Sequence, residues 1–127
     1  MNQEVYKFID QADDFLKDAE YLMTGDRYKG VVNRSYYAIF AAVQALLFAK
    51  DEFSKTHTGV ANKFYSLYIK TNIFSTDFGK VLNRAYQKRQ TGDYDAGAHI
   101  TFEEAAQVLE DARWFLNETR IYIDKNR

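Results

Sequence analysis

Residues 36–49 read Tyr-Tyr-Ala-Ile-Phe-Ala-Ala-Val-Gln-Ala-Leu-Leu-Phe-Ala, an apolar run that only Gln44 interrupts. A helix needs roughly 20 apolar residues to cross a bilayer, and this run is shorter. Its side chains are apolar on nearly every side of a helix, which is typical of a helix with neighbours all around it. We therefore predict a central core helix over residues 27–50 and no membrane-spanning segment.

Apolar residues recur at every third or fourth position in the segments that flank this run, which is the spacing of one helix face. No segment shows the two-residue alternation of a strand. The sequence therefore predicts an all-α fold, an up-and-down bundle of about five helices in a single domain over residues 1–127. The first helix is predicted to end at Thr24-Gly25-Asp26, with Gly25 in the left-handed position. Ser54 is predicted to cap a third helix over residues 55–70, and Ser75 or Thr76 to cap a fourth. A loop over residues 90–100 then leads to a fifth helix, which begins with the capping box Thr101-Phe102-Glu103-Glu104.

The composition of the 127 residues excludes several classes of protein. The chain has no Cys, which rules out disulfides, a thiol nucleophile and thiolate zinc sites. Seventeen Lys and Arg against eighteen Asp and Glu give a net charge of −1, so any contact with nucleic acid has to come from a local patch. No phosphate-binding loop or metal-spaced histidine pair is present, and we expect neither a cofactor nor a metal.

The first fourteen residues carry four acidic side chains and one lysine, with no apolar segment. A secretory signal peptide has the opposite pattern, a basic start followed by an apolar stretch. We therefore expect a cytoplasmic protein.

Three short strings carry most of the residues with chemical potential. They are Asn33-Arg34-Ser35-Tyr36-Tyr37-Ala38-Ile39-Phe40, Lys55-Thr56-His57-Thr58-Gly59-Val60 and Arg89-Gln90-Thr91-Gly92-Asp93-Tyr94. In this order and spacing they resemble the HEPN family (higher eukaryotes and prokaryotes nucleotide-binding domain), over nearly the whole chain. The resemblance implies a helical bundle that forms a homodimer, often encoded beside a minimal nucleotidyltransferase as a toxin–antitoxin pair. Some members of the family are metal-independent ribonucleases, and others are binding modules without catalysis.

Catalytic members of the family carry an Arg and, after a short interval, a His. Arg89 matches the Arg, but Tyr94 stands where the His is expected, in the variant string Arg-x-x-x-Asp-Tyr. A guanidinium suits the charge that develops on phosphorus, whereas a phenol with an ordinary pKa of about 10 is a poor base at neutral pH. The candidate catalytic residues are Arg89, Asp93 and Tyr94, and activity as a metal-independent endoribonuclease stays open.

Lys55, His57 and Arg34 are the candidate residues for binding RNA or nucleotide. A contact within the bundle or a dimer would bring His57 near Arg89. Each residue also has a structural alternative: packing in the first turn for Lys55 and His57, and a carboxylate partner from another helix for Arg34.

The motif residues have structural alternatives as well. Arg89 fits a cation at a helix C-terminus, paired with Asp93 or Asp95. Asp93 beside Gly92 fits an Asx-turn, and Tyr94 fits a buried ring that shapes the loop.

Two functions remain open at this stage. The first is a subunit of a toxin–antitoxin-like module that binds RNA or nucleotide, with or without cleavage, in a dimer cleft around Arg89. The second is a non-catalytic module that docks a partner nucleotidyltransferase or binds nucleotide without turnover. The resemblance also makes Tyr94 a candidate for modification, because in related pairs the nucleotidyltransferase transfers adenylate to a tyrosine beside the Arg motif. Twenty-one aromatic residues are more than a small bundle easily buries, which favours a homodimer.

Overall fold

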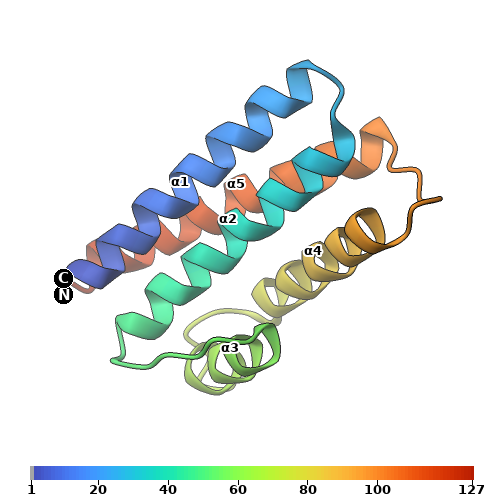
Figure 1. Cartoon of the computed structure of the whole chain (residues 1–127). Coiled ribbons are helices and arrows are strands. Elements are labelled where there is room, and N and C mark those ends of the chain that lie inside the picture. Colours follow the sequence, from blue (N-terminus) through green and yellow to red (C-terminus); the bar gives the residue numbers. More distant parts are fainter. Residues whose placement is uncertain (1) are drawn as a thin grey trace.

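The computed structural model describes residues 2–127, and this range folds into helices without a strand (Figure 1). The prediction of an all-α bundle with five α-helices is confirmed. A single π-helical turn continues the third helix. In chain order the elements are α1 (Gln3–Thr24), α2 (Tyr28–Phe48), α3 (His57–Phe64), η1 (Tyr65–Ile69), α4 (Thr76–Tyr94) and α5 (Phe102–Lys125).

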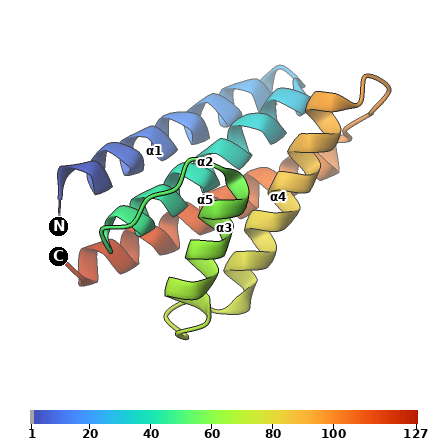
Figure 2. The same cartoon turned by 60° about the horizontal axis from the view of Figure 1, so that its bottom comes forward.

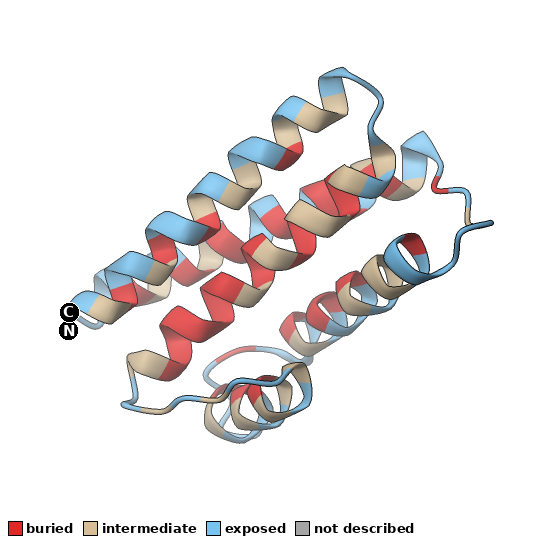
Figure 3. Ribbon diagram, in the orientation of Figure 1, coloured by how far each residue is buried: buried red, intermediate tan, exposed pale blue. Residues whose placement is uncertain are grey.

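The central position predicted for the apolar run is also confirmed. Every residue from Ala41 to Leu47 on α2 is buried, and α2 packs against α1, α5, α4 and α3 (Figure 3). By length and hydropathy α2 would also suffice to cross a membrane, but 72% of its apolar window is buried inside the bundle. That burial is what a core helix requires.

The arrangement places α3 and α4 together on one side of α2. The long helices α1, α2 and α5 lie side by side, and the described ends of the chain are neighbours at one end of the bundle (Figures 1 and 2). Aromatic rings fix α4 against the rest, because Phe78 stacks on Phe74 at 4.3 Å and meets Phe115 of α5 at 5.4 Å between ring centroids. The site described below therefore rests on a firmly packed helix.

The left-handed residue that ends α1 is Asp26, with φ 58°, and not Gly25, whose φ is −100°. The amide of Arg27 donates to the carbonyl of Leu22, and the amide of Asp26 donates to that of Met23. This Schellman pattern places its left-handed residue one position later than we predicted. Asp tolerates the left-handed conformation better than most residues with a side chain, so the turn forms without a glycine there.

The third helix begins two residues later than predicted. Thr56, and not Ser54, is its N-cap, and the Thr56 hydroxyl accepts from the amide of Gly59. A Cβ at position 59 would lie 2.1 Å from the Ser54 hydroxyl, so a larger residue there would require Ser54 to move. The helical path then continues through η1 to Ile69, close to the predicted end.

The predicted loop over residues 90–100 is wrong in its first half, because α4 continues to Tyr94. Side chains within the helix support this extension. Arg89 pairs with Asp93 one turn later, and the Thr91 hydroxyl donates to the carbonyl of Gln87. Gly92 is buried in the last turn, where a helix can come close to Ile100. The motif that we placed on a loop is therefore held on a rigid helix.

The capping box of the fifth helix is confirmed. Thr101 accepts from the amide of Glu104, and the Glu104 carboxylate accepts from the amide of Thr101. Lys88 of α4 also binds this carboxylate, and the bonds to Lys88 and Thr101 lower the pKa of Glu104 to about 2. The start of α5 is thus tied to the helix that carries Arg89. Ser75 precedes α4 as predicted, but its side chain makes no capping bond.

Candidate functional site

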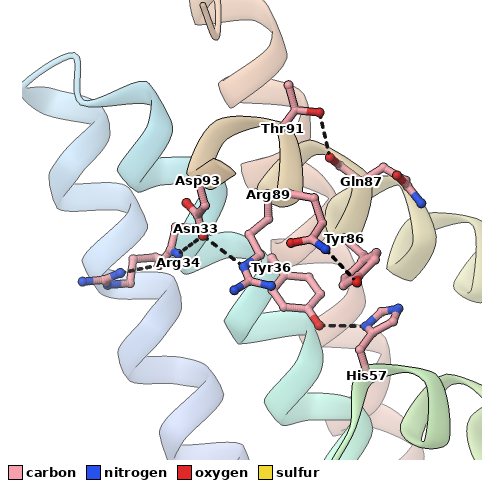
Figure 4. A network of polar contacts seen from close by, with 10 residues as sticks. Asn33, Arg34, Tyr36, His57, Tyr86, Gln87, Arg89, Thr91 and Asp93 are labelled. Atoms are coloured by element: carbon pink, nitrogen blue, oxygen red, sulfur yellow. Dashed lines mark hydrogen bonds and ion pairs between the residues drawn. The ribbon is translucent and has the colours of Figure 1, made fainter. Parts of the chain in front are cut away.

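Arg89 lies near the end of α4, where that helix faces α2 (Figure 4). Its side chain is only 15% exposed, and its Nε donates to Oδ2 of Asp93 at 3.1 Å. Asn33 of α2 donates its Nδ2 to the same carboxylate oxygen, also at 3.1 Å. The carboxylate therefore joins the two helices and fixes the direction of the guanidinium.

Three tyrosine rings surround the Arg89 guanidinium. Its central carbon lies 5.4 Å from the ring centroid of Tyr36, 5.2 Å from that of Tyr37 and 5.7 Å from that of Tyr94. These distances are within the range of cation–π attraction. Burial by itself would lower the pKa of Arg89, but the nearby Tyr37, Tyr94 and Asp93 raise it overall. The group stays a cation with a fixed direction, and the planar guanidinium has the donor geometry that binds phosphate oxygens.

His57 reaches the same site from the first turn of α3. Its Nδ1 lies 2.8 Å from the Tyr36 hydroxyl, and its ring stacks on Tyr86 of α4 with centroids 3.6 Å apart. Burial, and then the charge of Arg89, lowers the pKa of the imidazole. Gln90 in turn donates to the Tyr86 hydroxyl at 2.8 Å. The structure thus brings His57 and Arg89 into one cluster. Of the two routes considered from the sequence, a contact within the bundle or a dimer, packing within the bundle is enough.

We define the Arg89 cluster as Arg89, Asp93, Asn33, Tyr36, Tyr37, His57 and Tyr86. Its members come from three separate stretches of sequence and meet where α2, α3 and α4 adjoin.

The HEPN domain model matches this chain over residues 5–122. The protein belongs to the HEPN family. A candidate toxin of Methanocaldococcus jannaschii is 40% identical over 125 residues, which cover 98% of this chain and 85% of the relative. A UPF0332 protein of Thermotoga maritima is 40% identical over 94 residues, with coverage of 74% and 70%. A second candidate toxin of M. jannaschii is 28% identical over 120 residues, with coverage of 94% and 89%.

In this HEPN protein the predicted site residues do not all lie together. Arg89, Asp93 and His57 belong to the Arg89 cluster and Tyr94 lies beside Arg89, whereas Lys55 is exposed in the segment before α3. Arg34 is half-buried on α2, beside the cluster in Figure 4.

Several structural alternatives from the sequence are wrong. Tyr94 is not buried, because 74% of it is exposed, and Asp93 is an ion-pair partner inside a helix and not an Asx-turn residue. Arg34 does not meet a carboxylate of another helix within residues 2–127; its guanidinium donates to the side-chain carbonyl of Asn33, its neighbour in sequence. The alternative pairing of Arg89 with Asp93, and not Asp95, is present.

Sequence reasoning named neither Asn33, Tyr36 and Tyr37 nor Tyr86 as site residues. Tyr86 lies three residues before Arg89, so both are on one face of α4, and this spacing was a usable signal. Asn33 carried no such signal, because its partner Asp93 is sixty residues away in sequence. No group of three His, Cys, Asp or Glu within the described range has the arrangement of a metal site.

Proposed function

We propose that this HEPN protein is a toxin-like component of a two-component module and binds RNA or nucleotide through the Arg89 cluster. The observation that carries the proposal is the Arg89 side chain, which is 15% exposed, is bound by Asp93 and has its guanidinium surrounded by three tyrosine rings. Fixed guanidinium groups bind phosphate, and aromatic rings stack on bases. The two relatives named as candidate toxins support the same class of function.

An arginine packed among tyrosines adds little to the stability of the fold, and an apolar side chain in the same place would add more. A buried ion pair is often no more stabilising than well-packed apolar residues of the same volume. A cluster of polar and aromatic groups from three helices therefore argues for a ligand more than for stability. Lys55 and Arg34, which lie outside the cluster, would extend the contact to further phosphates.

The test is incubation of the purified protein with single-stranded RNA in the presence of EDTA, with binding and cleavage measured in parallel. Arg89→Ala should keep the helical circular-dichroism signal and lose about tenfold or more in RNA affinity, because a charge-assisted contact disappears. Arg113→Ala is the matched control, since Arg113 pairs with Glu20 and Glu110 on exposed faces of the other side of the bundle. Equal RNA affinity of the two variants and the wild type would contradict the proposal. Cleavage by the wild type that Arg89→Ala abolishes would make the protein a metal-independent ribonuclease.

A second function is favoured by the exposure of Tyr94. Its ring is 74% exposed at the C-terminal end of α4, within cation–π distance of Arg89. A partner nucleotidyltransferase would join the Tyr94 oxygen to the α-phosphorus of ATP, with loss of the phenolic proton and release of pyrophosphate. The bound phosphodiester would then occupy Arg89 and block RNA.

Intact-mass measurement after co-expression with a neighbouring nucleotidyltransferase tests this second function. An adduct of one adenylate is expected on the wild type and is lost in Tyr94→Phe. Tyr21→Phe is the control, because Tyr21 is 78% exposed on α1, away from the cluster. An adduct that persists in Tyr94→Phe would assign the modification to another residue.

We also propose that the chain is one cytoplasmic domain that forms a homodimer. Large apolar side chains remain exposed, including Phe53, Tyr65 and Phe102, each about half exposed at 49%, 55% and 52%. Exposed aromatic residues are enriched at protein interfaces. A monomeric mass by light scattering at tens of micromolar would contradict the dimer.

A further inference from the structure

The imidazole of His57 is held on two sides. Its ring lies flat on Tyr86, with an angle of 15° between the ring planes, and its Nδ1 is 2.8 Å from the Tyr36 hydroxyl. The backbone that carries it is also held, because the Thr56 hydroxyl caps α3 by accepting from the amide of Gly59, and Gly59 lies closely against Ser54. His57 is therefore oriented before any ligand arrives.

The hydroxyl of Tyr36 decides where the His57 proton lies. Tyr36 is 2% exposed, and burial raises the pKa of its phenol, so the phenol keeps its proton. His57 is the hydrogen-bond partner of this hydroxyl within residues 2–127. The geometry fits either direction of this bond, but a buried O–H that does not donate costs free energy, which favours the arrangement in which Tyr36 donates to Nδ1. A neutral imidazole that accepts at Nδ1 carries its proton on Nε2.

The surroundings also keep the ring neutral. The titratable groups that face it are Tyr36 from α2 and Tyr86 and Arg89 from α4. Burial and then the charge of Arg89 lower the pKa of His57, and no carboxylate acts to raise it. At neutral pH the side chain is an N–H donor without a charge.

We infer that His57 binds the ligand of the Arg89 cluster as a fixed neutral donor, through Nε2–H, and does not act as a general base. Nε2 has no hydrogen-bond partner within residues 2–127. It is also not one of the fully buried polar atoms of that range that lack a partner, so it is not fully buried. His57 and Arg89 both contact the Tyr36 ring, at 5.8 Å and 5.4 Å from its centroid. The ligand chemistry that fits is a nucleotide or RNA chain, with a phosphate on Arg89 and a further phosphate or ribose oxygen on His57. The identity of this ligand rests on the proposed function.

This inference deepens the proposed function and excludes one version of it. A ribonuclease in which His57 removes the proton of a 2′-hydroxyl needs a lone pair on Nε2, the atom that carries the proton here. If RNA is cleaved at all, His57 holds the substrate and another group takes the proton.

Nitrogen-15 NMR of the histidine side chains tests the proton position without any ligand. The protein has two histidines, and His99→Gln leaves only the His57 signals. At pH 7 we expect a neutral ring with the proton on Nε2. Tyr36→Phe should abolish this preference, because Nδ1 then loses its donor. A cationic ring, or a proton on Nδ1 in the wild type, overturns the inference.

Titration with adenosine 5′-monophosphate, and separately with a single-stranded RNA decamer, tests the contact with the ligand. Binding should shift the Nε2 resonance of His57 and leave that of His99 in place. His57→Leu should weaken binding about tenfold, the size of one hydrogen bond to a charged group. His57→Gln, which keeps an N–H near the position of Nε2, should retain most of the affinity, and His99→Leu should retain all of it. Circular dichroism confirms that each variant is folded.

The outcomes separate the inference from the proposed function. If the wild type binds these probes and His57→Leu binds equally well, His57 is not a ligand contact while the proposed function stands. If the wild type binds neither probe, the proposed function fails, and with it the contact assigned to His57.

Discussion

The middle and the two ends of the chain carry opposite charge. Residues 27–100, which form α2, α3, η1 and α4, hold eleven Lys and Arg against five Asp and Glu. The outer segments, residues 1–26 and 101–127, hold six against thirteen and form α1 and α5. The net charge of −1 for the whole chain conceals this separation. Overall charge therefore says little about whether one side of a small protein is suited to bind RNA.

The two regions also use their charges differently. Arg113 pairs with Glu20, and Arg120 pairs with Asp13, so exposed ion pairs on the acidic side join α5 to α1, each at 3.0 Å. On the basic side the central cation, Arg89, is packed among rings and is largely buried. We conclude that α1 and α5 form a scaffold, whereas α2, α3 and α4 carry the Arg89 cluster. Four predictions test this division.

The largest effect on stability is expected in the scaffold. Phe115 of α5 is fully buried and contacts the rings of Phe64 and Phe78. Phe115→Ala should lower the free energy of unfolding by about 3–5 kcal/mol, because it removes buried apolar area and leaves a cavity. Urea denaturation measures this loss. Tyr94→Ala, on the site side and mostly exposed, should change stability by less than about 0.5 kcal/mol. Similar losses in both variants would contradict the division.

The second prediction reverses a charge on each side. Lys55→Glu before α3 should weaken RNA binding severalfold and reduce the dependence of affinity on salt by about one phosphate contact. Lys125→Glu makes the same change of charge at the end of α5 and should leave affinity within twofold, because it lies on the acidic side. Fluorescence anisotropy at several salt concentrations measures both. Equal weakening by the two variants would mean that only the net charge matters.

The third prediction concerns stability at acid pH. His57 has a lower pKa in the folded protein than in the unfolded chain, so the unfolded chain binds its proton first as pH falls. The stability that the neutral ring contributes is present above about pH 6.5 and is lost as pH falls through the folded value. Between pH 7.5 and pH 5.5 the wild type should therefore lose more stability than His57→Gln, measured by urea denaturation. A parallel loss in the two proteins would show that His57 is not buried as a neutral group.

The smallest effect is expected at the exposed ion pairs of the scaffold. Arg120 and Asp13 lie 3.0 Å apart, with side chains 45% and 28% exposed. Solvent screens such a pair, so Arg120→Ala should cost about 0.2–1 kcal/mol. The same denaturation experiment in 1 M salt should reduce the difference between variant and wild type. A loss larger than that of Phe115→Ala would mean that these charges, and not the aromatic core, hold α5 in place.

The sequence predicted the helices well because their signals are local. The apolar run on α2, the three-and-four spacing elsewhere and the capping box at Thr101 each depend on residues close together in the chain. Two predictions were wrong because a neighbouring residue took the expected role. Thr56 is the N-cap in place of Ser54, and Asp26 is in the left-handed conformation expected of Gly25. At Gly92 the helix continues through a residue that usually favours a loop; the Arg89–Asp93 pair spans this position and Ile100 lies against it, and both contacts depend on the folded helix.

The candidate site was predicted only in part, because its contacts join distant parts of the chain. Three strings gave Arg89, Asp93 and His57, which the structure places together. The partners that hold them, Asn33 for Asp93 and Tyr86 for His57, depend on how α2, α3 and α4 pack. Periodicity gives the face of a helix but not the residue opposite it.

The π-helical turn η1 has a consequence for how relatives of different length should be aligned. A π turn has one more residue than an α turn, and it usually sits as a single turn inside an α-helix. In this chain the π turn, Tyr65–Ile69, follows α3 directly and ends that helical segment, between the strings that contain His57 and Arg89. A relative with a regular α-helix there would be one residue shorter between those two strings. An alignment should place that gap in this turn, where it leaves both ends of the site in register.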